Sequence, residues 1–177
     1  PARSVYKLEE IDRRCRILGP GMKVLDLGAS PGSWTLYAAG KVGASGEVLG
    51  LDLKPHRGAL PPQARFEVRD VTAVKPDELG GIVWDVVLSD MAPSTTGHRG
   101  TDMARSFQLF MDALALARVV LRPGGSFVGK IFQGQDFPEA QSAMRAAFEN
   151  VRVIRPEATR DVSYEVFLVG TGRRAEP

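Results

Sequence analysis

Short apolar runs alternate with stretches of helical periodicity along the whole chain. Apolar residues spaced three and four positions apart predict a helix over residues 4–18. A nearly continuous apolar run over residues 82–89 instead predicts a strand that is covered on both faces. The same criteria predict helices over 33–42, 105–121 and 138–150, and strands over 23–27, 47–51, 65–68, 126–132, 151–154 and 164–170.

The order of these elements predicts an α/β fold with a mostly parallel sheet of seven strands and helices on both faces. The strand over 151–154 follows a helix and should run parallel to the strand before it. The link over residues 155–163 is shorter than the dozen or so residues that a parallel crossover needs. We therefore expect an antiparallel last strand, which begins at the carboxyl edge where open α/β sheets bind ligands.

Composition narrows the class of protein. A length of 177 residues predicts a single domain over 1–177, with residues 1–19 as its N-terminal helical segment. The 23 basic and 21 acidic residues argue against coating nucleic acid through bulk charge, but not against a local basic patch. The chain has no apolar run long enough to span a membrane, and its single cysteine, Cys15, fits the cytoplasm. Because it begins at Pro1 rather than Met, we expect native sequence to precede it.

A glycine-rich turn follows the first predicted strand and precedes a helix, which is typical of a nucleotide site. It reads Gly-Ala-Ser-Pro-Gly from Gly28, without the middle glycine of a dinucleotide fingerprint, and so favours a nucleoside ligand without a pyrophosphate. Asp52 ends the second strand, where an acid that binds ribose is expected. Asp70 ends the third and could accept a hydrogen bond from adenine. Alternatively, both aspartates only cap loops.

Three ionisable residues fall on the predicted carboxyl edge: Asp90, Lys130 and Glu165. A single lysine at a strand end usually extends its amine into solvent. Two acids from distant parts of the sequence beside Lys130 instead predict a site with perturbed pKa values.

Four segments in order, GASPGSW from Gly28, SDMAP from Ser89, GSFVGKIFQG from Gly125 and SYEV from Ser163, resemble the FtsJ (RrmJ, RlmE-like) family. The similarity runs from Arg3 to Arg173. Members of this family are S-adenosylmethionine-dependent ribose 2′-O-methyltransferases that act on RNA. The resemblance implies a Rossmann-like methyltransferase fold, the cofactor S-adenosylmethionine and its product S-adenosylhomocysteine.

The resemblance also implies the site residues. The family's catalytic tetrad corresponds to Lys7, Asp90, Lys130 and Glu165, of which Lys7 is implied by resemblance alone. Ser30 and Ser33 stand where many members carry alanine and glycine. The expected cofactor-binding residues are Gly28, Ser30, Pro31, Gly32, Ser33, Trp34, Asp52, Asp70, Val71 and Asp90.

Lys130 is the candidate general base for a ribose hydroxyl. Burial and a nearby Lys7 would lower its pKa, whereas Asp90 and Glu165 would raise it, and the sequence leaves that balance open. The two histidines, His56 and His98, and one cysteine have no metal-site spacing, so we expect no metal.

The expected substrate is a uridine of large-subunit (23S) ribosomal RNA, bound by a monomer in the cytoplasm without a membrane. Transfer RNA and RNA caps remain alternatives within the family, as does a non-catalytic assembly factor that binds S-adenosylmethionine and RNA. A nicotinamide-dependent oxidoreductase is disfavoured by the missing middle glycine. Residues 94–101 form either a loop that closes over substrate or an ordinary connection. Candidate phosphate contacts are Arg3, Arg13, Arg14, Lys54, His56, Arg57, His98, Arg99, Arg105, Arg155 and Arg160.

Overall fold

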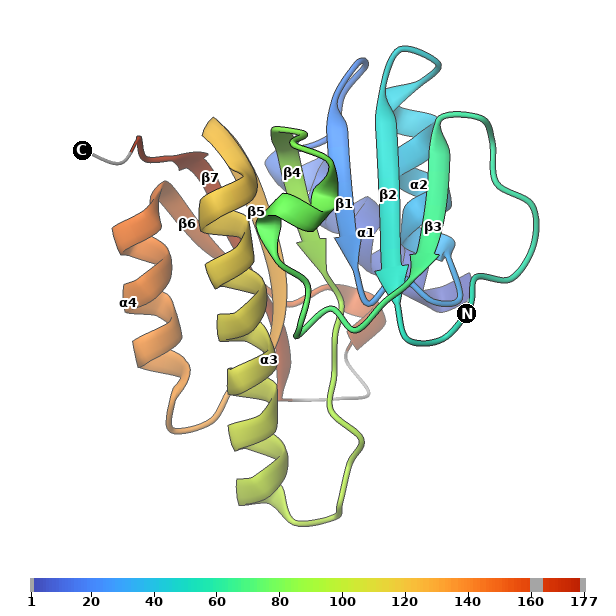
Figure 1. Cartoon of the computed structure of the whole chain (residues 1–177). Helices are drawn as coiled ribbons and strands as arrows, with labels where there is room; N and C mark the ends of the chain where they lie inside the picture. Colours follow the sequence, from blue (N-terminus) through green and yellow to red (C-terminus); the bar gives the residue numbers. More distant parts are fainter. Residues whose placement is uncertain (1, 160–163, 176–177) are drawn as a thin grey trace.

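A computed structural model describes residues 2–159 and 164–175, whose strands form one seven-stranded sheet in the order β3-β2-β1-β4-β5-β7-β6 (Figure 1). The strands are β1 (Lys23–Leu27), β2 (Glu47–Asp52), β3 (Ala64–Val68), β4 (Trp84–Ser89), β5 (Leu121–Phe132), β6 (Phe148–Ile154) and β7 (Glu165–Arg173). The helices are α1 (Ala2–Cys15), α2 (Ser33–Val42), α3 (Arg99–Val120) and α4 (Phe137–Ala147), with 3₁₀ turns η1 (Pro76–Leu79) and η2 (Glu157–Thr159).

The sheet confirms the predicted topology. Strands β1 to β5 pair in parallel, and β7 is antiparallel to both of its neighbours, β5 and β6. Since β5 and β6 both oppose β7, they run in the same direction, as expected. The sequence did not predict that β7 would insert between them, and this insertion places Glu165 opposite Phe132 at the carboxyl edge.

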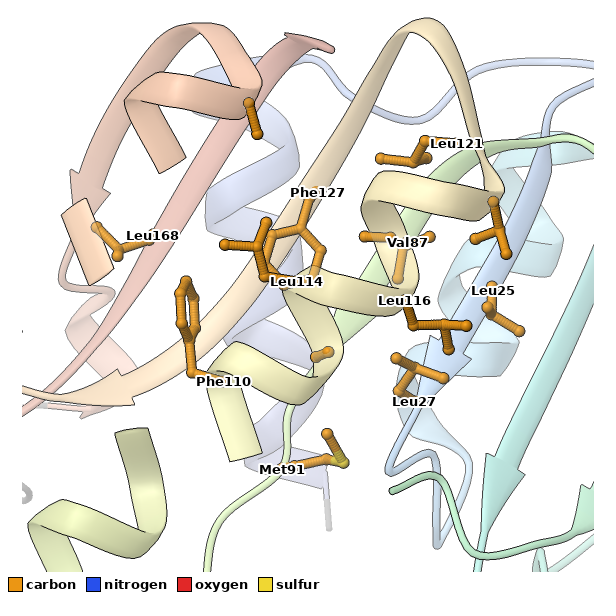
Figure 2. Packing of buried hydrophobic residues seen from close by; sticks show 14 of the residues in the cluster. Leu25, Leu27, Val87, Met91, Phe110, Leu114, Leu116, Leu121, Phe127 and Leu168 are labelled. Atoms are coloured by element: carbon orange, nitrogen blue, oxygen red, sulfur yellow. The ribbon is translucent and has the colours of Figure 1, made fainter. Parts of the chain in front are cut away.

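Alternate strand residues supply two hydrophobic layers, as the period of two in a strand requires. Val24, Val86 and Val128 are buried with residues of α1 and α2, whereas Leu25 and Val87 are buried with residues of α3 and α4. Figure 2 shows the second layer, in which Phe110, Leu114 and Leu116 of α3 lie over Val87 and Phe127 of the sheet. Each such aliphatic or aromatic side chain contributes about 1.5–3 kcal/mol on burial.

The first helix ends at Cys15, three residues before the apolar spacing predicts. The Asp12 carboxylate accepts hydrogen bonds from the backbone N–H groups of Ile17 (3.2 Å) and Leu18 (3.1 Å), while Arg16 adopts a positive φ of 51°. Leu18 still packs on the α1–α2 layer, so its apolar character reflects tertiary contact rather than helix.

Helix α3 begins at Arg99, six residues before the predicted start. His98 is its N-cap, and the ring atom Nδ1 accepts from the Thr101 backbone N–H at 3.2 Å. Residues 99–101, predicted as loop, are therefore the first helical turn. Further boundaries differ from the prediction: β4 starts at 84 rather than 82, α3 ends at 120, β5 starts at 121, α4 spans 137–147, β6 starts at 148 and β7 spans 165–173. Within the described residues, no helix is long and apolar enough to cross a membrane.

Candidate active site

The strand period brings three of the predicted catalytic residues to one face of the sheet. Asp90, Lys130 and Glu165 each lie two positions from a buried residue of the α1–α2 layer, at the carboxyl edge, and so face the same helices. These neighbouring residues are Leu88, Val128 and Phe167. Lys7 comes to the same place from α1, which covers this face (Figure 1).

The four side chains form one chain of ion pairs. Lys130 Nζ lies 3.0 Å from Asp90 Oδ1 and 3.7 Å from Glu165 Oε2, and Lys7 Nζ donates to Glu165 Oε1 at 3.0 Å. The side chain of Lys130 is 9% exposed and that of Glu165 is 7% exposed. Two positive and two negative groups therefore balance at a site whose centre, Lys130 and Glu165, is buried, while Lys7 and Asp90 at its two ends are partly exposed.

The surroundings of Lys130 decide the pKa balance that the sequence left open. Burial favours the neutral amine, but the Asp90 and Glu165 carboxylates favour the ammonium and outweigh it. The pKa of Lys130 is held above its ordinary value, so the free enzyme carries Lys130 as a cation.

Helix α1 is fastened to the glycine-rich turn. Trp34, in the first turn of α2, is 3% exposed, and its indole Nε1 donates to the backbone carbonyl of Ser4 at 2.8 Å. Ser4 Oγ in turn donates to Asp90 Oδ2 at 3.1 Å. Sequence reasoning missed Ser4, because nothing distinguishes a serine in the first turn of a surface helix. These bonds join the predicted catalytic tetrad to the turn.

The turn itself is held by strand β2 and the loop after it. The Asp52 carboxylate accepts from the backbone N–H groups of Ser30 (2.9 Å) and Lys54 (3.1 Å). Ser30 Oγ donates to the carbonyl of Pro55 at 3.1 Å. The turn is thus preformed, and the loop-capping role considered for Asp52 is part of its geometry.

Gly32 can be no other residue in this arrangement. Its φ is 120°, and a Cβ atom there would lie 2.1 Å from Nδ1 of the His56 ring, which packs against it. Gly32 is also the N-cap of α2, and no side chain caps that end. The free N–H groups there suit a negatively charged part of a ligand.

Asp70 and Val71 lie after the end of β3, which stops at Val68. Asp70 is exposed and accepts from both the N–H (3.0 Å) and the hydroxyl (2.6 Å) of Thr72, and these bonds lower its pKa. The structure thus shows the alternative, loop-capping geometry, and contact with adenine stays a prediction. Val71 packs against the α3–α4 layer.

A further acid, Asp26, was not predicted. It lies in β1 with 0% exposure; Thr35 Oγ1 donates to Oδ2 at 2.8 Å, whereas Oδ1 has no hydrogen-bond partner among the described residues. Burial, with smaller contributions from Asp90 and Asp52, raises its pKa to about 8. The sequence does contain a signal for this residue, because an aspartate between apolar residues in a strand predicted to be buried indicates a buried carboxyl group.

The phosphate-contact candidates are dispersed. Arg14 pairs with Glu10, and Arg155 bonds to Gln133. His56 packs against Gly32 with both ring nitrogens buried, so the prediction that His56 contacts phosphate is wrong. Arg160 lies outside the described residues. No group of three potential metal-binding side chains occurs over 2–159 and 164–175.

Solved structures share this fold. A Plasmodium falciparum protein described as a ribosomal RNA methyltransferase superposes with a TM-score of 0.85 over 98% of both chains, at 22% identity. Human methyltransferase-like protein 13 in complex with S-adenosylhomocysteine superposes with a TM-score of 0.61 at 17% identity, over 89% of this chain and 73% of that one. The chain therefore shares the fold of these two proteins, both of which are described as methyltransferases or methyltransferase-like.

Sequence comparison identifies the family. The FtsJ-like methyltransferase model matches residues 1–173, and the chain belongs to that family. The chain is 54% identical to ribosomal RNA large subunit methyltransferase E of Sorangium cellulosum, over 99% of this chain and 83% of that protein. It is 48% identical to the protein of the same name from Nitratidesulfovibrio vulgaris, over 99% of this chain and 90% of that protein. The predicted fold class, family and cofactor are confirmed: the chain is a methyltransferase that uses S-adenosylmethionine.

Asp26→Asn tests the buried carboxyl. Between about pH 5 and 7 the folded carboxyl holds a proton that the unfolded one has lost, so stability falls as pH rises, by up to about 1.4 kcal/mol per pH unit. The amide keeps a bond from Thr35 but does not titrate, so we expect the variant to lose this slope in urea unfolding measured across that range. Asp77→Asn, at an exposed site, should keep it. Equal slopes for wild type and Asp26→Asn would contradict the assignment.

Gly32→Ala tests the turn. The strained backbone and the contact with His56 should lower the affinity for S-adenosylhomocysteine roughly tenfold or more, as measured by calorimetry. The matched control is Gly40→Ala within α2, where a Cβ atom meets open space. This variant should bind S-adenosylhomocysteine like wild type, and its helix should be stabilised by up to about 1 kcal/mol. Wild-type affinity in Gly32→Ala would rule out a close approach of ligand to this backbone.

Proposed function

We propose that this methyltransferase modifies a ribose 2′-hydroxyl of large-subunit ribosomal RNA, at a uridine of the 23S molecule. The observation that carries the proposal is the chain of ion pairs from Lys7 through Glu165 and Lys130 to Asp90, since a hydroxyl needs both orientation and loss of a proton. The names of the curated relatives, which specify the large ribosomal subunit, support the RNA substrate.

We assign cofactor binding to the turn and the strand ends around it. When bound, S-adenosylmethionine supplies a methyl group on a positively charged sulfur. The uncapped start of α2 suits its carboxylate, Asp52 its ribose, and the Asp70–Val71 segment its adenine. The residues assigned to this site are Gly28, Ser30, Pro31, Gly32, Ser33, Trp34, Asp52, Asp70, Val71 and Asp90.

Lys130 is assigned as the residue that holds the 2′-hydroxyl and receives its proton. In the free enzyme Lys130 is already protonated, so this role requires a lower pKa in the loaded site. A positive charge brought close to an ammonium group lowers its pKa, and closure by substrate increases the desolvation that acts in the same direction. Lys7 and Glu165 position the amine, and Asp90 holds it from the opposite side.

The remaining assignments follow from this substrate. We propose that residues 1–177 act as one domain and as a monomer, in the cytoplasm, without a membrane and without a metal. The segment before α3 contributes to the substrate side of the site.

Mapping ribose methylation in total RNA from cells with and without the gene tests the proposed function. We expect one 2′-O-methyl group in large-subunit ribosomal RNA to disappear with the gene and return with the wild-type copy. Loss of a mark in transfer RNA or at an RNA cap would contradict the substrate, and unchanged marks in all RNA would favour an assembly factor.

Lys130 substitutions test the catalytic assignment. General-base help contributes about 10²–10⁴-fold, so Lys130→Ala should lose most methyl transfer yet bind S-adenosylhomocysteine nearly as wild type does. Lys130→Arg keeps the positive charge but does not release a proton, so it should be equally inactive if Lys130 is the base. Lys23→Ala, an exposed lysine at the opposite edge of the sheet, is the control. Substantial turnover in Lys130→Arg would show that Lys130 only positions the hydroxyl.

A further inference from the structure

A hollow of about 300 Å³ lies beside the carboxyl edge, between the start of α3 and the residue before β7. This volume is at the lower end for sites that bind small organic groups. It is lined by Thr95, Gly97, Arg99, Asp102, Met103 and Tyr164. None of these residues belongs to the catalytic tetrad or to the turn assigned to the cofactor.

An aromatic ring and a guanidinium group form the walls of the hollow. The Tyr164 ring is held by Phe132, whose ring meets it edge to face with centroids 4.9 Å apart. The guanidinium carbon of Arg99 lies 5.3 Å from the centroid of the Tyr164 ring. Aromatic rings and planar guanidinium groups are the surfaces on which proteins stack unpaired nucleobases.

The loop before α3, which lines the hollow opposite Tyr164, is held by hydrogen bonds. Asp102 is buried, and its Oδ1 accepts from both the backbone N–H and the hydroxyl of Thr96 at 2.9 Å. These bonds, the backbone bond first, lower the pKa of Asp102. Its Oδ1 is therefore engaged within the loop, and the lining of the hollow carries one carboxylate, Asp102, and one guanidinium group, Arg99.

The hollow and the tetrad are neighbours because Tyr164 and Glu165 are adjacent in the chain. Tyr164 directly precedes Glu165, and the Tyr164 carbonyl accepts from the Gln133 N–H at 2.7 Å, which extends the pairing with β5 by one residue. Neighbouring residues of an extended strand point to opposite faces. Glu165 faces α1, and Tyr164 lines the hollow with α3, so the two sites lie on either side of one strand end.

We propose that this hollow binds a nucleobase of the substrate RNA, either that of the methylated nucleotide or that of its direct neighbour, by stacking on Tyr164 beside Arg99. The inference rests on the proposed RNA substrate. Tyr164 is then a specificity-determining contact, and not a catalytic residue. The base sits on the α3 side of the strand end while the ribose reaches Lys130 on the α1 side.

Tyr164→Ala and Tyr164→Phe test the stacking surface. Loss of the ring should raise the KM for a large-subunit ribosomal RNA transcript roughly 5- to 150-fold, with less change in kcat and none in S-adenosylhomocysteine affinity. Tyr164→Phe keeps the ring and should behave like wild type. Arg99→Gln removes the planar cation beside the ring and should also weaken RNA binding. Thermal unfolding of each variant separates loss of fold from loss of contact.

Binding of a short oligouridylate, measured by fluorescence anisotropy with S-adenosylhomocysteine present, tests the hollow independently of methyl transfer. A series of oligouridylates, each lacking the base at one position, should show the largest loss of wild-type affinity at a single position. Removal of the base at that position should have no further effect on the affinity of Tyr164→Ala. Equal RNA affinity in wild type and Tyr164→Ala, or the same abasic penalty in both, would overturn the proposal. Wild-type protein that binds RNA but transfers no methyl would contradict the proposed function alone.

Discussion

The structure depends on holding two lysines and two carboxylates together around a buried centre formed by Lys130 and Glu165. A charge removed from water without a partner costs several kcal/mol, whereas Lys130 between Asp90 and Glu165, with Lys7 on the outer oxygen of Glu165, leaves a neutral group of four. The residues come from α1, the end of β4, β5 and β7, so the site exists only when these elements have come together. The antiparallel insertion of β7 between β5 and β6 is what returns Glu165 to the edge where β4 and β5 end.

Two hydrogen bonds join the glycine-rich turn to the group of four charged residues. Trp34 holds the carbonyl of Ser4, and Ser4 holds Asp90, so the start of α2 and the start of α1 are fixed relative to the tetrad. A methyl transfer needs donor and acceptor in line, and misplacement by about 1 Å can cost about 10²-fold. A buried tryptophan at this turn thus contributes to alignment as well as to the hydrophobic layer.

Much of the fold could be predicted because its signals are local. The strand over 23–27 and the helix over 33–42 were predicted to the residue, since Gly-Pro-Gly precedes the strand and the glycine-rich turn separates the two. The start of α3 could not be predicted, because its cap is a ring nitrogen of His98 whose role depends on how the loop folds. The end of α1 was predicted three residues too late, because Leu18 is apolar and yet lies after the helix, where it packs on the α1–α2 layer.

By itself, the sequence determined that Asp90, Lys130 and Glu165 fall on the carboxyl edge of the sheet, but not which face of the sheet each would occupy. It also determined the direction of the last strand, since nine residues are too few for a parallel crossover. Only the tertiary structure decided where β7 inserts and that Lys7 contacts Glu165 and Ser4 contacts Asp90. It also decided that the pKa of Lys130 is raised and that the pKa of Asp26 reaches about 8. These depend on distances and burial between segments remote in sequence, which no local pattern encodes.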